Sequence, residues 1–286
     1  LFPFKLFISL IHSSLIIRKF KPDLIIGTGG FASGPLLQVA AWLNYPTLIQ
    51  EQNSYPGITN RILGKNVDRI CVAFDCMEKF FPQSKIRITG NPIRDYIVKI
   101  KSNKISKKFF DLDLDKKTLV IIGGSLGSEC INNLIKSELE YIKSFGLQII
   151  WQCGSLYYEK LKSFGSKKVI IKPFINHIDH LYSAADYIIS RAGAGSISEL
   201  SCVAKPSLLI PSPNVSENHQ LHNARVLAKK KAILLIQEKD LDKKFKAIFS
   251  QLVMDKKIQK EMIKNLKSFA LPDATKNIIK EIKDIL

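Results

Sequence analysis

The chain has 286 residues, of which 46% are hydrophobic, and this length is long for one core and suits two globular domains. Its formal net charge of +18 comes mostly from scattered lysines, since only seven of the 43 basic residues are arginine, and this disfavours a protein that reads nucleic-acid bases. Five cysteines without Cys-x-x-Cys spacing disfavour a disulfide framework or a zinc site and indicate a reducing compartment.

The first predicted element is a helix over residues 1–20. Polar residues such as Lys5 and Ser9 interrupt its apolar run too often for a spanning helix, and no signal-peptide cleavage site follows. One face either packs on the domain or lies at a membrane surface; it comprises Phe4, Phe7, Ile8, Ile11 and Leu15. Because the chain begins with Leu inside this helix, we expect that residues upstream are missing.

The first half of the chain predicts short parallel strands alternating with helices. Strands are expected at 24–26, 47–50, 69–72 and 86–89, with helices at 35–43 and 57–64. These are too few strands for a complete Rossmann-like domain, which also favours an incomplete N-terminus. The lysine-rich segment 99–108 is expected to be a linker or a surface excursion.

A second alternating series begins at Leu119 and predicts a second parallel sheet. Its expected strands are 119–122, 147–152, 168–171, 186–190, 207–210 and 232–237. Its expected helices are 129–144, 156–163, 177–184, 196–203, 217–229, 241–252 and 255–269, and a final amphipathic helix is expected at 274–285. The two series together predict an α/β protein of two Rossmann-like domains.

Three small-residue turns follow apolar strands. They are Gly27-Thr28-Gly29-Gly30, Gly123-Gly124-Ser125-Leu126-Gly127 and Arg191-Ala192-Gly193-Ala194-Gly195-Ser196. A strand that enters a glycine-rich turn and then a helix presents free N–H groups and a positive helix end, which suits a phosphate or diphosphate. The turns therefore predict ligand sites at the carboxyl edges of the two sheets.

Polar residues near the third turn suit recognition of a sugar. Glu199 is expected either to cap its helix in a capping box with Ser196 or to accept hydrogen bonds from ribose hydroxyls. The string Asn218-His219-Gln220 with Asn223 suits polyhydroxyl recognition, because amide side chains both donate and accept.

Together these residues resemble the MurG family, the UDP-sugar-dependent bacterial N-acetylglucosaminyltransferases of GT-B fold that convert lipid I to lipid II. The resemblance covers nearly the whole chain. Its strings are Lys21-Pro22-Asp23, Gly27-Thr28-Gly29-Gly30-Phe31, Glu51-Gln52-Asn53, Gly90-Asn91-Pro92-Ile93-Arg94, Gly123-Gly124-Ser125-Leu126-Gly127, Phe174-Ile175, Arg191-Ala192-Gly193-Ala194, Ser198-Glu199 and Asn218-His219-Gln220.

The resemblance implies two Rossmann-like domains whose parallel sheets face a cleft. Residues 1–95 would be a partial N-terminal domain on the acceptor and membrane side, and 96–270 a C-terminal domain that binds UDP-N-acetylglucosamine. A last helix at 271–286 would pack back on the N-terminal domain. The implied partners are UDP-N-acetylglucosamine, lipid I and the cytoplasmic face of the bacterial inner membrane, with no cofactor and no nucleic acid.

The resemblance also implies roles for individual residues. Ser125 and its loop, with Arg94 nearby, would hold the donor diphosphate, and the backbone of Ile175 would read uracil. Glu199 would grip the ribose. The nucleotide would be wrapped by Ala194, Gly195, Ser196, Ile197 and Ser198. The N-acetylglucosamine hydroxyls would contact Asn53 and Gln220, and the acceptor diphosphate would face Gly27, Thr28, Gly29 and Gly30.

Two departures from the family pattern affect the catalytic base. The family's N-terminal glycine-rich loop ending in a histidine has no counterpart here, and Gln50 stands where a histidine usually precedes Glu-Gln-Asn. Glu51 is the carboxylate that we expect as base. No Asp-x-Asp motif adjoins the loops, which fits a metal-independent transferase with inversion at the anomeric carbon.

Three alternatives stay open. Another lipid-linked UDP-sugar transferase, such as a diacylglycerol glycosyltransferase, would share the donor site, although Asn218-His219-Gln220 and Glu51-Gln52-Asn53 favour the muramyl acceptor. A nucleotide-sugar-binding module without catalysis would share it too. A basic nucleic-acid binder is the third.

Overall fold

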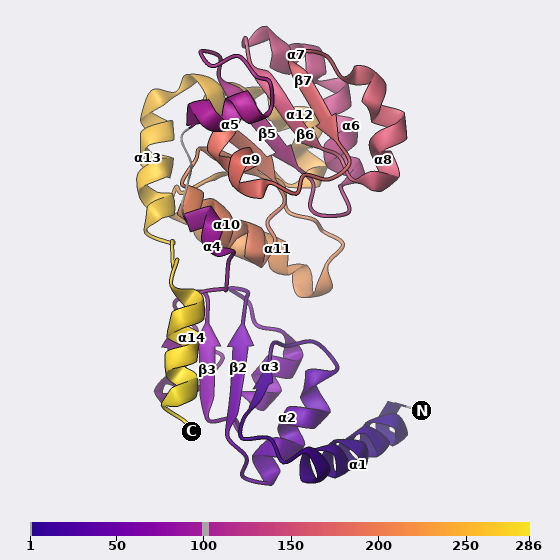
Figure 1. Ribbon diagram of the computed structural model, residues 1–286, viewed down its shortest axis with the longest axis vertical. Helices are drawn as coiled ribbons and strands as arrows, with labels where there is room; N and C mark the ends of the chain where they lie inside the picture. Colours follow the sequence, from indigo (N-terminus) through magenta and orange to yellow (C-terminus); the bar gives the residue numbers. More distant parts are fainter. Residues whose placement is uncertain (1, 99–102) are drawn as a thin grey trace. The chain divides into compact units, whose positions relative to one another are not determined.

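The computed structural model describes residues 2–98 and 103–286, and the chain divides into two compact units (Figure 1). Unit 1 comprises the residues up to Pro92 together with Leu271–Leu286, and unit 2 comprises Ile93–Ala270. The predicted boundaries were 95/96 and 270/271. The roles expected for the two parts, acceptor side and donor side, stay predictions at this point.

Unit 1 is built on a parallel sheet in which the strands follow chain order, β1-β2-β3-β4. The strands are β1 (Ile25–Gly27), β2 (Thr47–Glu51), β3 (Arg69–Val72) and β4 (Ile86–Ile88), and the short turn η1 (Gln83–Lys85) precedes β4. The helices are α1 (Phe2–Phe20), α2 (Ser33–Trp42), α3 (Ile58–Leu63) and α14 (Ala274–Lys283). Every residue of β2 is buried, as expected for an inner parallel strand.

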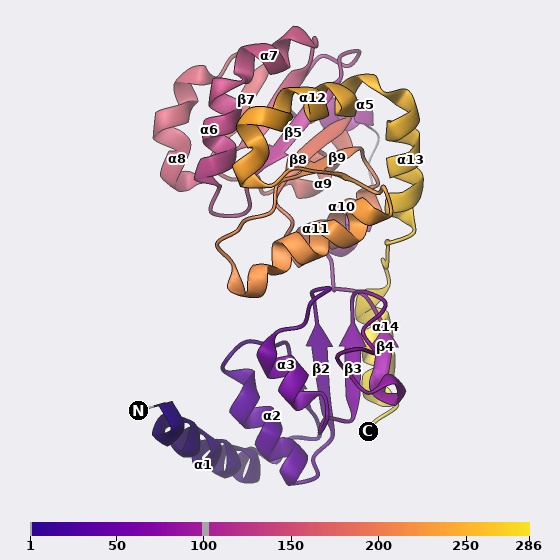
Figure 2. The same cartoon turned by 180° about the vertical axis from the view of Figure 1, so that it is seen from behind.

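Helix α14 follows unit 2 in the sequence but belongs to unit 1 and completes it (Figure 2). Its Glu281 carboxylate lies 3.1 Å from Nε of Arg69 on β3 and 3.3 Å from Nε of Arg87 on β4. Close packing fixes the start of the helix, since a Cβ on Gly90 would lie 2.6 Å from Cβ of Leu271. A carboxylate shared by two arginines therefore fastens this segment to the sheet.

Helix α1 packs on α2 through the side opposite to the one expected to be buried. Ile17 is buried in the core of unit 1, Leu10 packs against that core, and Ser13 is buried. The predicted packing face is exposed: Phe4 by 67%, Phe7 by 61% and Ile11 by 45%. The packing interpretation of that face was therefore wrong. No described helix is long and apolar enough to cross a membrane.

Unit 2 has a six-stranded parallel sheet in the order β10-β9-β8-β5-β6-β7. Counted from β5 this is the 3-2-1-4-5-6 order of a Rossmann fold, so the predicted α/β fold is confirmed. The strands are β5 (Thr118–Ile122), β6 (Gln148–Gln152), β7 (Val169–Lys172), β8 (Tyr187–Ser190), β9 (Ser207–Leu209) and β10 (Leu234–Leu235). The central strands are apolar and fully buried, and Trp151 is the largest side chain in this core.

The helices of unit 2 are α4 (Asp95–Val98), α5 (Asn103–Phe109), α6 (Glu129–Ser137), α7 (Leu139–Ser144), α8 (Ser155–Leu161), α9 (Ile178–Ala184), α10 (Ala194–Val203), α11 (His219–Lys229), α12 (Leu241–Met254) and α13 (Lys256–Lys267). The short turns η2 (Lys162–Phe164), η3 (Ser216–Asn218) and η4 (Glu238–Asp240) join them. The single helix predicted at 129–144 is two, because Glu138 leaves helical geometry at φ −102°, ψ 11°.

The linker predicted at 99–108 was wrong over its second part, where α5 forms; residues 99–102 lie outside the described residues. Lys107 of α5 is buried, lies 3.4 Å from the Asp186 carboxylate and donates to the Lys116 carbonyl. Burial of this lysine is possible because its charge is paired. A lysine-rich segment can therefore form a packed helix when a distant carboxylate receives it.

Candidate functional site

The carboxyl ends of β5 and β8 form the topological switch point of the unit 2 sheet, where helices leave in opposite directions. The turn Gly123–Gly127 follows β5, and Arg191–Gly195 follows β8. Parallel strands bring both turns to one edge. The sequence thus placed two of its three glycine turns where α/β folds bind ligands.

The glycines of the first turn are required by its backbone geometry. Gly124 has φ +96° and Gly127 has φ +81°, and a Cβ on Gly127 would lie 2.0 Å from the Cys153 carbonyl oxygen. Ser128 then caps α6 by accepting a hydrogen bond from the Ile131 N–H at 3.3 Å. Ser125 is exposed on this turn, ahead of the positive end of α6.

The N-terminus of α10 has no side-chain cap. The helix starts at Ala194 after Gly193, so Ser196 lies inside the first turn and the predicted capping box is wrong. The Ile197 N–H donates to the Gly193 carbonyl at 2.9 Å, and the Ser198 hydroxyl donates to the Ala194 carbonyl at 3.0 Å. The N–H groups of residues 194–196 precede the first intrahelical bond and are the ones suited to an anion.

Glu199 sits one turn further along α10 and is held from α9. The hydroxyl of Tyr182 donates to its Oε2 at 2.9 Å. Burial raises the pKa of Glu199, while the Tyr182 hydrogen bond and the Arg94 charge oppose that rise. Burial also raises the pKa of Tyr182 well above its usual value, with the Glu199 carboxylate adding to the rise, so the tyrosine keeps its proton at neutral pH and acts as a hydrogen-bond donor. Arg94 therefore acts electrostatically on Glu199.

Gln220 is fixed by two backbone groups at the start of α11. Its Oε1 accepts from the Ser212 N–H at 2.9 Å and from the Ala192 N–H at 3.3 Å. Both partners are fixed donors, so the amide nitrogen must point the other way. Gln220 borders a polar cavity of about 630 Å³ whose lining includes Gly123, Gly127, Ser128, Arg191 and Asn214.

Arg191, in the turn after β8, is a functional residue for which the sequence predicts no individual role. Its guanidinium donates to Ser128 Oγ at 2.5 Å and to the Ile210 carbonyl at 3.0 Å, and it lies 2.6 Å from a carboxylate oxygen of Glu238. It thus ties the end of the glycine turn to the loops after β8 and β9. The sequence signal that could have identified Arg191 is a single arginine next to a glycine-rich turn.

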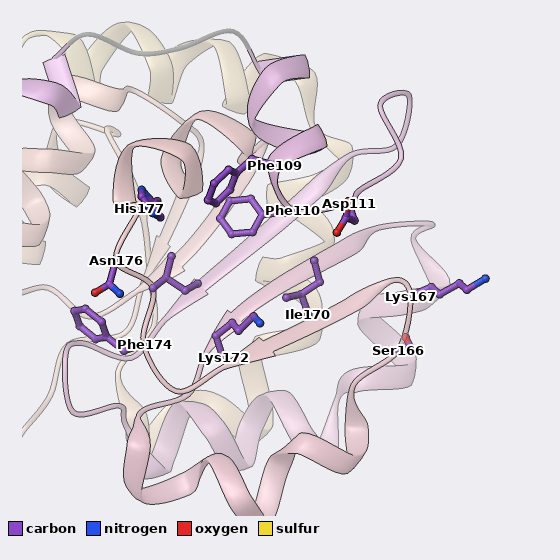
Figure 3. A pocket seen from close by; sticks show the side chains of 11 residues that line it. Phe109, Phe110, Asp111, Ser166, Lys167, Ile170, Lys172, Phe174, Asn176 and His177 are labelled. Carbon is purple, nitrogen blue, oxygen red and sulfur yellow. The ribbon is translucent and has the colours of Figure 1, made fainter.

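A second hollow, of about 710 Å³, lies beside β7 (Figure 3). Phe174 and Ile175, from the loop after β7, line one end of it, and Phe109 and Phe110 from the end of α5 line another. Phe174 is 46% exposed. The predicted base-reading residue Ile175 thus borders an apolar hollow that offers an aromatic ring.

In unit 1, side-chain amides join three of the motif strings at the carboxyl edge of the sheet. Gln52 Nε2 donates to the Thr28 carbonyl at 3.0 Å. Gln50 Nε2 donates to Asn91 Oδ1 at 2.8 Å, and Asn91 Nδ2 donates to the Gln52 carbonyl at 3.1 Å. The turn Gly27–Gly30 is thereby linked to the strings that contain Gln52 and Asn91.

Glu51 is at the centre of this edge and is 2% exposed. Its Oε1 accepts from the N–H of Asn53 at 2.9 Å and from Asn53 Nδ2 at 3.3 Å. Its Oε2 accepts from Asn60 Nδ2 at 2.8 Å and from the Gly57 N–H at 3.3 Å. Both oxygens therefore hold the loop 52–57, and the prediction that Glu51 is the base stays untested.

The structure thus gathers Ser125, the start of α10, Glu199, Arg94, Ile175 and Gln220 in unit 2, and Gly27–Gly30, Glu51 and Asn53 in unit 1. Sequence reasoning missed Tyr182 and Gln152. Gln152 is a polar residue at the end of an apolar strand, which was a usable signal. Within residues 2–98 and 103–286, no three His, Cys, Asp or Glu side chains gather as a metal site.

Two family models match the chain. The glycosyltransferase family 28 N-terminal domain matches residues 1–72, and the glycosyltransferase family 28 C-terminal domain matches residues 118–278. The second match alone covers more than half of the chain.

Curated relatives match nearly all of it. The UDP-N-acetylglucosamine–N-acetylmuramyl-(pentapeptide) pyrophosphoryl-undecaprenol N-acetylglucosamine transferase of Flavobacterium psychrophilum is 50% identical over 99% of this chain and 77% of its own length. The protein of the same name from Christiangramia forsetii is 48% identical over 100% of this chain and 78% of its own.

Solved structures agree. MurG from Acinetobacter baumannii superposes with a TM-score of 0.82 at 27% identity, covering 99% of this chain and 79% of that one. A structure of S. aureus MnaA with UDP has a TM-score of 0.70 at 14% identity, covering 99% of this chain and 81% of that one, and it shows a shared fold alone.

Proposed function

Because the chain belongs to glycosyltransferase family 28, within the group of UDP-N-acetylglucosamine–N-acetylmuramyl-(pentapeptide) pyrophosphoryl-undecaprenol N-acetylglucosamine transferases, we propose that it converts lipid I to lipid II. The reaction moves N-acetylglucosamine from UDP to the muramyl sugar on an undecaprenyl diphosphate carrier, a step of peptidoglycan synthesis. The carrying observation is 50% identity over 99% of the chain to a transferase of that name.

The switch point of unit 2 is the proposed donor site. The turn Gly123–Gly127 and the uncapped start of α10 converge there, and both present N–H groups and a positive helix end to a diphosphate. Glu199 would accept hydrogen bonds from the ribose hydroxyls, and Ile175 with the exposed ring of Phe174 would receive the uracil. Gln220 would donate its amide N–H to the sugar.

These groups suit a direct displacement. The 4-hydroxyl oxygen of the acceptor forms a bond to the anomeric carbon while the bond from that carbon to the diphosphate oxygen breaks, which inverts the carbon. The electron pair leaves with UDP, and the hydroxyl proton passes to a base. Fixed N–H groups at residues 123–126 and 194–196 would stabilise the charge that grows on UDP in the transition state; the Gly127 N–H is bonded to the Gly124 carbonyl.

Unit 1 is the proposed acceptor side. The turn Gly27–Gly30, held through Gln52, would face the acceptor diphosphate, and Asn53 would reach the donor sugar. Glu51 would fix Asn53 whether or not it also takes the proton, because both its oxygens accept bonds from the loop 52–57. Its proposed role in either case includes positioning.

The exposed face of α1 is the proposed contact with the membrane. Phe4, Phe7 and Ile11 are exposed together, and Lys5, Arg18 and Lys19 flank them. An apolar helix face edged by cations binds an anionic bilayer surface peripherally. Since the acceptor's lipid tail stays in the membrane, we propose that the protein works at the cytoplasmic face of the inner membrane.

The test is a transfer assay with labelled UDP-N-acetylglucosamine and either a short-chain lipid I analogue or diacylglycerol. We expect label in the lipid II product only, and transfer to diacylglycerol alone would overturn the muramyl assignment. Calorimetry with UDP and pyrophosphate tests the donor site separately. Glu199→Ala is expected to weaken UDP by about 1.5–3 kcal/mol and pyrophosphate not at all; equal UDP affinities would remove Glu199 from the ribose.

A further inference from the structure

Gln152 joins two loops of the proposed donor site through its side chain. It is the last residue of β6, which lies between β5 and β7 in the sheet, and it is 4% exposed. Its Nε2 donates to the Gly124 carbonyl at 3.1 Å, in the glycine turn after β5. Its Oε1 accepts from the Ile175 N–H at 2.9 Å, in the loop after β7. One amide therefore spans the diphosphate-binding and base-binding loops.

The chemistry of this bridge requires an amide. One loop offers an acceptor and the other a donor, so the bridging side chain must donate and accept at once. A carboxylate could accept from Ile175 but could not donate to Gly124, and an apolar side chain would leave both backbone groups without this partner. Breaking this bridge is costly chiefly at Ile175, whose buried N–H would lose its bond to Gln152 without gaining water, whereas the Gly124 carbonyl would keep its bond from the Gly127 N–H at 3.2 Å.

We propose that Gln152 is a positioning residue that sets the distance between the base and diphosphate subsites, so that UDP meets both at once. The proposal rests on the donor function proposed above. Gln152 itself need not touch the nucleotide.

UDP behaves here as a bivalent ligand whose two ends are linked at fixed length. Its affinity exceeds that of its parts only when the two subsites keep the matching separation. Loosening the bridge should therefore cost UDP more than it costs uridine or pyrophosphate, each of which needs one subsite only. A role confined to folding would affect all three ligands alike.

The experiment measures UDP, uridine and pyrophosphate binding by calorimetry in the parent chain, Gln152→Met and Gln152→Glu. We expect UDP to bind about tenfold more weakly in both variants, while uridine and pyrophosphate change by less than about threefold. In a donor-saturation assay the loss should appear in KM for UDP-N-acetylglucosamine. Thermal unfolding reports whether each variant is folded, and Gln152→Glu keeps the Ile175 contact if Gln152→Met does not fold.

Gln148 is the matched control, since it is the first residue of the same strand and equally buried. At the opposite end of the strand its amide holds a single segment, donating to the Asp113 carbonyl at 2.7 Å and accepting from the Asp113 N–H at 3.0 Å. Gln148→Met should lower the melting temperature and leave the ratio of UDP to uridine affinity unchanged. An equal ratio in Gln152→Met and Gln148→Met would overturn the proposal. Failure of the parent chain to bind UDP would instead overturn the donor function.

Discussion

The two units present different chemical groups at the carboxyl edges of their parallel sheets. In unit 2 the edge presents backbone groups, from the turn with positive φ at Gly124 and Gly127 and from the uncapped start of α10. In unit 1 the edge has a glycine turn too, but it adds a network of side chains, in which Gln50, Gln52, Asn91 and Asn60 are arranged around Glu51. Fixed N–H groups suit a diphosphate whose charge grows during reaction, whereas a side-chain network suits positioning of a hydroxyl acceptor.

The glycine turns themselves give the sharpest test of this difference. Gly127→Ala should lower the free energy of unfolding by about 2–5 kcal/mol and abolish UDP binding, because its Cβ would meet the Cys153 carbonyl at 2.0 Å. Gly30→Ala in unit 1 should cost only about 1 kcal/mol, since φ is +78° but nothing lies within 4 Å of its Cβ. Denaturant unfolding and calorimetry measure both, and similar losses in the two variants would remove the distinction.

The exposed apolar face of α1 in unit 1 provides the next test. Phe7→Glu with Ile11→Glu should weaken binding to anionic phospholipid vesicles by about 3 kcal/mol, near 100-fold, because two exposed apolar side chains would no longer enter the interface. Met254→Glu, on an exposed apolar residue of unit 2, should sediment with vesicles as the parent does. Normal sedimentation of the double variant would restrict α1 to packing.

Disrupting the side-chain network of unit 1 should impair acceptor binding and leave UDP binding at the donor site unchanged. Asn60→Ala removes one of the two donors to Glu51 Oε2 and should cost about 1–3 kcal/mol of unfolding free energy. We expect a higher KM for the lipid I analogue with unchanged UDP affinity. The exposed Asn66→Ala is the control and should change neither. A fall in UDP affinity on Asn60→Ala would show that the two edges are not independent.

The smallest expected effect is at the side chain that holds Glu199. Tyr182→Phe should weaken UDP by about 0.5–1.5 kcal/mol. The Tyr182 hydrogen bond lowers the pKa of Glu199 against the rise caused by burial, so its loss should raise that pKa further. The ionised carboxylate is the form that accepts the ribose hydroxyls. As the pH is lowered, UDP affinity should therefore begin to decline at a higher pH in the variant than in the parent.

Tyr187→Phe is the matched control for Tyr182→Phe. This tyrosine is also buried in unit 2, and its hydroxyl donates to the Val253 carbonyl at 3.3 Å, in α12. It should lower stability without moving the pH dependence of UDP binding. An identical pH profile in the Tyr182 variant would show that its hydroxyl does not tune Glu199.

Much of this architecture could be predicted because its signals are local. Buried parallel strands are continuous apolar runs, and the turns after β5 and β8 need glycine, so Gly123–Gly127 and Arg191–Gly195 stand out from the sequence. The elements that were mispredicted depend on partners far away in the chain. The segment around Lys107 is a helix because Asp186 neutralises that lysine.

Side-chain roles were less predictable because they are set by tertiary contacts. The sequence pattern of Ser196 and Glu199 matches a capping box, yet the helix starts earlier and Glu199 meets Tyr182 from another helix. Glu51 was singled out as a carboxylate, while its four hydrogen-bond donors lie up to nine residues away and could not be counted in advance. The spacing of residues along the chain does not predict which way a carboxylate side chain points or how many hydrogen bonds it accepts.

The return of α14 to unit 1 has a consequence for biosynthesis. The Arg69 and Arg87 pair receives Glu281 only after all of unit 2 has been translated, which takes on the order of ten seconds or more at about 5–20 residues per second. Over that interval unit 2 can fold on the ribosome, while unit 1 waits with an uncovered patch beside Gly90. The nascent chain can thus complete unit 2 before unit 1, and a ribosome that stalls just after residue 270 leaves a product whose defect lies in unit 1, the half made earliest.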